Sequence, residues 1–200
     1  MRIIAGKAKG RTLYAPSGRE TRPTSDKIRG SLFNIIGSRV VEARVLDLFG
    51  GTGALALEAL SRGADSAVIA DSAREAQQVI ERNARAVLKE AAEDRVRIIK
   101  SDYRAALTAL AGSVFDLVFL DPPYRMADAY GAALTRLVEG DMLAPGCLVV
   151  LERRRDVQVA VPAPFAVTDT RQYGDTAVDF VELDAAAEQI QAPQRHTNMD

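Results

Sequence analysis

The segment FDLVFLDPPYRM, residues 115–126, ends an apolar run with an aspartate, two prolines and a tyrosine. Proline fixes φ at about −65° and has no N–H, so this turn is rigid and its carbonyl groups are left to accept hydrogen bonds. The Asp121 carboxylate and the Pro122 carbonyl could hold the two N–H bonds of a planar amino group, while Tyr124 stacks on the base that carries it. Such contacts would localise the lone pair of a poorly nucleophilic exocyclic amine and stabilise the cation formed when its nitrogen is methylated. Asp121, Pro122, Pro123 and Tyr124 are therefore the predicted catalytic residues.

A glycine-rich turn stands upstream, in VLDLFGGTGALALEALSRGA, residues 45–64. Gly51-Thr-Gly53-Ala-Leu-Ala56 fits the form G-x-G-x-x-A, in which glycines let the backbone approach a nucleotide at the start of a helix. Asp71 lies twenty residues after Gly51, where an acid accepts hydrogen bonds from ribose hydroxyls. This pattern is typical of NAD enzymes and of S-adenosylmethionine enzymes alike.

Two further acids favour S-adenosylmethionine. Asp47 stands four residues before Gly51, where a carboxylate would repel a pyrophosphate but attract an ammonium group. Asp102 ends another predicted strand and could bind an adenine amino group. Acids at three successive strand ends predict a site for a cationic nucleoside. The predicted cofactor-binding residues are Asp47, Phe49, Gly50, Gly51, Gly53, Asp71 and Asp102, and no metal site is expected.

The order of the elements predicts an α/β fold. Strands are expected at 44–49, 66–71, 95–102, 115–121 and 147–152, with helices between them, which implies a parallel, doubly wound sheet. The segment 165–183 predicts two more strands around a turn at Gly174 and Asp175 that form an antiparallel edge hairpin. We expect a basic β-hairpin and loop over residues 1–24, a catalytic domain over 25–183, and a disordered tail over 184–200.

Composition narrows the function classes. The chain is 48% hydrophobic and 26% charged, as in globular proteins, and no apolar run is long enough to cross a bilayer, so a soluble cytoplasmic protein is expected. Cys147 is the single cysteine, which excludes an intramolecular disulfide, and the single histidine, His196, lies in the predicted tail. A dehydrogenase would need an acid–base residue such as a core histidine or a Tyr-x-x-x-Lys pair, and neither is evident.

Positive charge is concentrated at the N-terminus. Residues 1–30 carry eight basic and two acidic side chains, whereas the whole chain has a formal charge of −1. A basic stretch on an otherwise acidic protein suggests a nucleic-acid partner, although a basic solvated surface would look the same. Lys7, Lys9 and Arg11 are expected to follow phosphates with salt-dependent affinity.

Five segments together resemble one family. They are MRIIAGKAKGRTL, TRPTSDKIRGSLFNI, DLFGGTGALALEALSRGA, LDPPY and RQYGDTAVDF, and the chain is similar over residues 1 to about 183 to the RsmD family of bacterial 16S ribosomal RNA guanine-N2 methyltransferases. The Asp-Pro-Pro-Tyr box is shared by many amino-methylating enzymes, whereas the two N-terminal segments are much more specific.

The resemblance implies a Class I methyltransferase fold of the Rossmann type, S-adenosyl-L-methionine as cofactor, and methylation of one guanine N2 in 16S rRNA within a 30S subunit or an assembly intermediate. It also places four residues against the target loop: Arg22, Thr24, Asp26 and Arg29. A monomer is expected. The alternatives are a DNA adenine-N6 or other nucleic-acid amino-methyltransferase, a catalytically silent RNA-binding module and, more remotely, an NAD-binding oxidoreductase. A DNA methylase usually carries a long target-recognition insert, and the connections here are short.

Overall fold

The structure is a computed structural model that describes residues 1–15 and 25–184, with the backbone but not the side chain of Tyr124. The strands are β1 (Arg44–Asp47), β2 (Ser66–Ala70), β3 (Val96–Ile99), β4 (Phe115–Leu120), β5 (Leu143–Arg154), β6 (Phe165–Tyr173) and β7 (Thr176–Leu183). The helices are α1 (Asp26–Ile36), α2 (Ala54–Ser61), α3 (Arg74–Leu88), α4 (Ala92–Arg95), α5 (Tyr103–Ala109) and α6 (Ala129–Glu139), with 3-10 turns η1 (Gly37–Val40), η2 (Lys89–Ala91) and η3 (Tyr124–Met126). In these described ranges no helix is long and apolar enough to cross a membrane.

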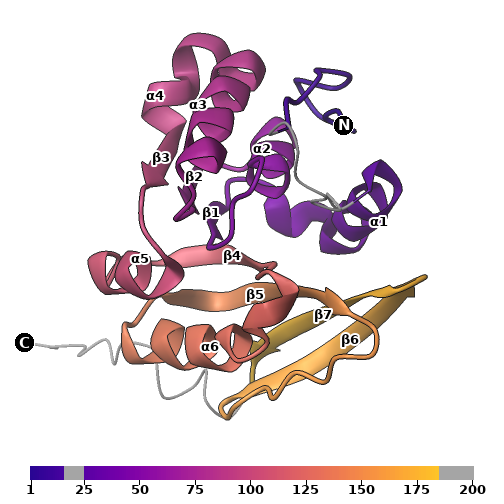
Figure 1. The fold of residues 1–200 in the computed structure, drawn as a ribbon, viewed down its shortest axis with the longest axis vertical. Coiled ribbons are helices and arrows are strands. Elements are labelled where there is room, and N and C mark those ends of the chain that lie inside the picture. Colours follow the sequence, from indigo (N-terminus) through magenta and orange to yellow (C-terminus); the bar gives the residue numbers. More distant parts are fainter. Residues whose placement is uncertain (16–24, 185–200) are drawn as a thin grey trace, which may run out of the picture.

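The strands form one sheet in the order β3-β2-β1-β4-β5-β7-β6 (Figure 1). Strands β1 to β5 are parallel, and β7 runs antiparallel to both β5 and β6. This confirms the predicted doubly wound sheet with an antiparallel edge hairpin. The chain winds outward from β1 to β3 and then returns to place β4 on the other side of β1. Such a reversal leaves a crevice at the carboxyl ends of β1 and β4, where α/β proteins bind ligands.

Helices cover both faces of the sheet. Helices α1, α2 and α3 and residues 1–15 pack on one face, where Phe33, Leu57 and Ile80 join one buried cluster. Helices α5 and α6 cover the other face, where Leu107 and Leu134 join a second cluster. Helix α2 is buried along its whole length because it lies beneath the N-terminal segment. That burial explains why its sequence, ALALEALS, is apolar apart from Glu58 and Ser61.

The N-terminal segment is a hairpin held by single bonds rather than by regular strands. Ile3 N–H donates to Arg11 O and Gly10 N–H to Ile3 O, both at 2.9 Å, and the only β-bridge formed by residues 1–15 is Arg2 to Thr12. The predicted β-hairpin therefore has the expected reversal but less strand pairing. Gly6 has φ of +82°, and a Cβ there would lie 1.9 Å from Ser61 O. Only glycine permits this close approach of the hairpin to α2.

Candidate active site

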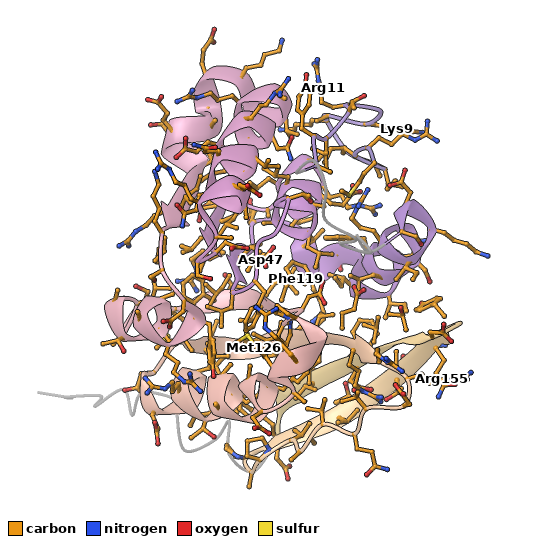
Figure 2. The ribbon with its side chains drawn as sticks, viewed as in Figure 1. Lys9, Arg11, Asp47, Phe119, Met126 and Arg155 are labelled. Carbon is orange, nitrogen blue, oxygen red and sulfur yellow. The ribbon has the colours of Figure 1, made fainter. Side chains whose placement is uncertain are left out.

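The Asp-Pro-Pro-Tyr box lies at the end of β4, beside the glycine-rich turn that follows β1. Asp47 pairs with Phe119 in the parallel register of β1 and β4, so Asp121 lies two residues beyond the level of Asp47 along the strand direction. Figure 2 shows Asp47 and Phe119 together at the centre of the molecule. Pro122 is buried and Pro123 is exposed, and the Pro123 carbonyl accepts Met126 N–H at 2.7 Å to close the turn η3. The box thus forms a fixed turn at the carboxyl end of β4, next to the end of β1.

Two carboxyl groups at the ends of β1 and β4 have raised pKa values. Burial, then the charge of Asp71, raises the pKa of Asp47 to about 7, although the N–H groups of Phe49 and Ala56 oppose the shift. Burial, then the charges of Glu152 and Asp47, raises the pKa of Asp121 well above its usual value. Carboxyl groups with raised pKa values are typical of functional sites. The ionised form of each group is disfavoured until a cation or a hydrogen-bond donor binds beside it. The crevice is therefore suited to a positively charged ligand.

The glycine turn is shaped by backbone contacts with β2. Gly50 N–H donates to Ala70 O at 2.9 Å, and a Cβ on Gly50 would lie 2.4 Å from the Ile69 side chain. Gly51 and Gly53 have φ of +54° and +76°, in the left-handed region that favours glycine. The turn needs glycine for two reasons, which are close packing on β2 at Gly50 and backbone conformation at the other two positions.

The two remaining predicted cofactor acids bind backbone N–H groups. Asp71 accepts Gly51 N–H at 2.9 Å through one oxygen and Ala73 N–H at 2.8 Å through the other, and so ties the glycine turn to the end of β2. Asp102 caps α5, where its Oδ1 accepts the N–H groups of Arg104 and Ala105. Phe49 packs its ring against Tyr103, with centroids 5.4 Å apart. The structure thus brings Phe49 next to the start of α5. Asp71 and Asp102 order the backbone of the glycine turn and of the first turn of α5.

The predicted cations of the hairpin are exposed on a segment that is firmly anchored. Lys7, Lys9 and Arg11 are all exposed, and Lys9 and Arg11 project outward in Figure 2. Glu58 of α2 accepts Ile4 N–H at 2.7 Å and Ala5 N–H at 3.0 Å. These bonds fix the backbone that carries the cations, so the hairpin presents them in a defined arrangement.

One predicted RNA-binding residue is corrected. Arg29 is wholly buried and pairs with Asp26 at 2.9 Å and with Glu58 at 3.7 Å, and it also donates to Arg2 O. The arginine therefore joins α1, α2 and the hairpin and does not face a target loop. Asp26 remains partly exposed at the start of α1, after the cap Ser25. Arg22 and Thr24 lie outside the described residues.

Sequence reasoning missed two acids. Glu58 is wholly buried, and its signal was a single charge within an otherwise apolar helix. Glu152 follows Leu151 on β5, and Leu151 pairs with Leu120, the residue before Asp121. The charge of Glu152 contributes to the raised pKa of Asp121. Its signal was a charge at the end of a strand that neighbours β4, which becomes visible only once the strand order is known.

Comparison with known proteins identifies the family. The family model described as "Conserved hypothetical protein 95" matches residues 1–182. "Putative rRNA methyltransferase YlbH" of Bacillus subtilis is 36% identical over 181 residues, covering 89% of this chain and 96% of the relative. "Ribosomal RNA small subunit methyltransferase D" of Escherichia coli is 33% identical over 189 residues, covering 94% of this chain and 92% of the relative.

A solved structure agrees with these relatives. "Putative methyltransferase yhhF from Escherichia coli" superimposes with a TM-score of 0.80 at 31% identity, covering 92% of this chain and 98% of that one. The predicted Class I methyltransferase fold is thereby confirmed. By sequence over nearly its whole described length, and by fold, the chain belongs to the family of ribosomal RNA small subunit methyltransferase D.

Proposed function

We propose that this protein transfers a methyl group from S-adenosylmethionine to the exocyclic N2 of a guanine in small-subunit ribosomal RNA, within an assembled or assembling 30S particle. The observation that carries the proposal is a pair of carboxyl groups, the buried Asp47 and the partly buried Asp121, at the ends of adjacent strands β1 and β4. One acid suits a cationic cofactor and the other, in a rigid Asp-Pro-Pro-Tyr turn, suits an amino group.

The residues present fit the cofactor. Asp47 is only 2% exposed, so its ionised form lacks hydration and gains from an ammonium group. A pyrophosphate would meet the same carboxylate with repulsion, which disfavours a dinucleotide at this turn. Asp47, Phe49, Asp71, Asp102 and the glycine turn 50–53 would hold the cofactor, and it would supply an electrophilic methyl group.

The chain's own contribution at the amine is orientation and proton handling. The Asp121 carboxylate and the Pro122 carbonyl each accept a hydrogen bond from one N–H of the guanine amino group, and the base lies beside Tyr124. When the nitrogen becomes positive, Asp121 stabilises the charge. The Asp121 carboxylate is then the adjacent acceptor for the proton that the nitrogen releases. No histidine is required for this sequence.

The RNA substrate is supported by the names of the relatives and by the basic hairpin. The Escherichia coli relative is named for methylation of small-subunit ribosomal RNA. In this chain the exposed Lys7, Lys9 and Arg11 would bind phosphates. Asp26 would meet the RNA beside Arg2, from which it lies 3.8 Å away. Action as a monomer remains a prediction.

The test is methyl transfer from labelled S-adenosylmethionine to three substrates: 30S particles from cells that lack the endogenous enzyme, protein-free 16S rRNA, and unmethylated DNA. Asp121→Asn keeps the side-chain shape and should lower the rate by about a hundredfold or more. Asp116→Asn is the matched control, because it makes the same change at the other end of β4, where Asp116 pairs with Arg44 on the surface. Label recovered as N2-methylguanine only with an intact Asp121 supports the proposal, whereas N6-methyladenine in DNA would refute the substrate assignment.

A further inference from the structure

An aromatic ring next to the cation-bearing hairpin is held in place although it is exposed. Tyr14 is 41% exposed. Its N–H donates to Asn83 Oδ1 at 2.8 Å, and its carbonyl accepts Asn83 Nδ2 at 3.0 Å. Asn83 is itself wholly buried in α3, so its amide cannot turn away from Tyr14 to bind water. The backbone of Tyr14 is therefore fixed by a rigid partner.

The ring is also fixed from one side by a cation. The Arg82 guanidinium carbon lies 3.2 Å from the centroid of the Tyr14 ring. Arg82 and Asn83 are consecutive residues of α3, so one helix holds both the backbone and the ring. An aromatic side chain that is ordered before binding loses little conformational entropy when a ligand stacks on it. The arrangement suits binding better than it suits burial, since 41% of the residue remains exposed.

The hollow beside this ring is basic. It has a volume of about 560 Å³ and is lined by residues 7–12, Tyr14 and Ala86. Three of the lining residues are the cations Lys7, Lys9 and Arg11, and no carboxylate lines it. The hollow is open to solvent, so a strand of RNA can enter it. Positive side chains around an exposed ring match the two parts of a nucleotide, a phosphate and a base.

We propose that this hollow, the Tyr14 site, binds one nucleotide of single-stranded RNA other than the guanine that is methylated. The base stacks on Tyr14, and the flanking phosphates contact Lys7, Lys9 and Arg11. The Tyr14 site is built from the hairpin and α3, whereas the catalytic carboxylates lie at the ends of β1 and β4. The inference deepens the proposed function and rests on it for the identity of the polymer.

The experiment measures the affinity of the full chain for two probes by fluorescence anisotropy. One probe is a single-stranded RNA dodecamer of mixed sequence, and the other is a ribose-phosphate chain of the same length without bases. Tyr14→Leu removes the aromatic ring and should weaken binding of the dodecamer by about tenfold, because stacking on an aromatic side chain accounts for factors of this size. Tyr14→Phe keeps the ring and should bind within about twofold of the wild type. Neither change should alter binding of the chain without bases, because its phosphates meet only the cations.

Each other outcome overturns the inference. If Tyr14→Leu binds the dodecamer as the wild type does, no base stacks on the ring. If it weakens both probes equally, the substitution acts on the hairpin fold or on phosphate contacts. If methyl transfer to 30S particles falls while binding of protein-free RNA does not, the site contacts a ribosomal protein. The proposed function is judged separately by wild-type methyl transfer, so an active wild type with an indifferent Tyr14→Leu refutes only the Tyr14 site.

Discussion

Replacing Asp47 by asparagine should stabilise the protein without its cofactor at alkaline pH. The carboxyl group is only 2% exposed, and it accepts Phe49 N–H at 3.3 Å. Asparagine has nearly the same shape and can still accept that N–H. The substitution therefore removes a buried charge while keeping the local packing.

The size of the effect follows from the pKa of Asp47. Burial raises it from 3.8 to about 7, so ionisation in the folded state is disfavoured by about 4 kcal/mol relative to the unfolded chain. Between these two values the folded state binds more protons than the unfolded state, and the free energy of unfolding falls as the pH rises. Asp47→Asn removes this fall. The variant should be close to wild type near pH 4 and more stable by up to about 4 kcal/mol above pH 7.

The assay is urea unfolding at several values between about pH 4 and pH 9, with the slope against urea checked for constancy. Asp116→Asn is the control with the opposite sign. Burial acts to raise the pKa of Asp116, but hydrogen bonds from Arg44 outweigh it and hold that pKa below its usual value. This partly exposed carboxylate stabilises the fold above its unfolded pKa, so its loss should cost less than about 1 kcal/mol at pH 8. An Asp47→Asn protein no more stable than the wild type at pH 8 would refute the reasoning.

Two further predictions concern the N-terminal hairpin. Glu58→Gln should lower the free energy of unfolding by about 3–5 kcal/mol, because Arg29 would lose a buried charged partner and an amide cannot accept every hydrogen bond that the carboxylate accepts. Urea unfolding measures this, with Glu182→Gln as a surface control expected to lose less than about 1 kcal/mol; a similar loss in both would contradict it. Replacing all three hairpin cations by glutamine should flatten the slope of log affinity for single-stranded RNA against log salt by about 2, at about 0.7 per lost phosphate contact, while cofactor affinity is unchanged. An unchanged slope would remove these residues from the RNA interface: Lys7, Lys9 and Arg11.

The fold was largely predictable because its signals are local. Apolar runs of strand length alternate with helical periodicity, and Gly174 with Asp175 turns the edge hairpin as expected. The differences in bounds are also local. Helix α6 ends at Glu139, where Gly140 caps it, and β5 begins at Leu143, earlier than the expected residue 147.

The roles of the charged residues were less predictable because their partners are distant in sequence. Arg29 was expected to face the target loop, yet it pairs with Glu58 and donates to the Arg2 carbonyl inside the core. Glu58 in turn receives backbone N–H groups from residues more than fifty positions away. No periodicity reveals such a pairing, because burial of a charge is decided by what the tertiary fold brings against it.

Asn83 shows how a long-range contact also joins the N-terminal hairpin to the glycine turn. Its Nδ2 donates to Tyr14 O at 3.0 Å and to Thr52 O at 2.8 Å, so one buried amide holds both the hairpin and the glycine turn. The two segments are separated along the chain, but each takes its position from the same rigid helix, α3. Displacing either one would leave a polar group of this amide without a partner in the core, which is costly where no water can replace it. The segment proposed to bind RNA and the turn proposed to bind the cofactor are therefore positioned together by α3.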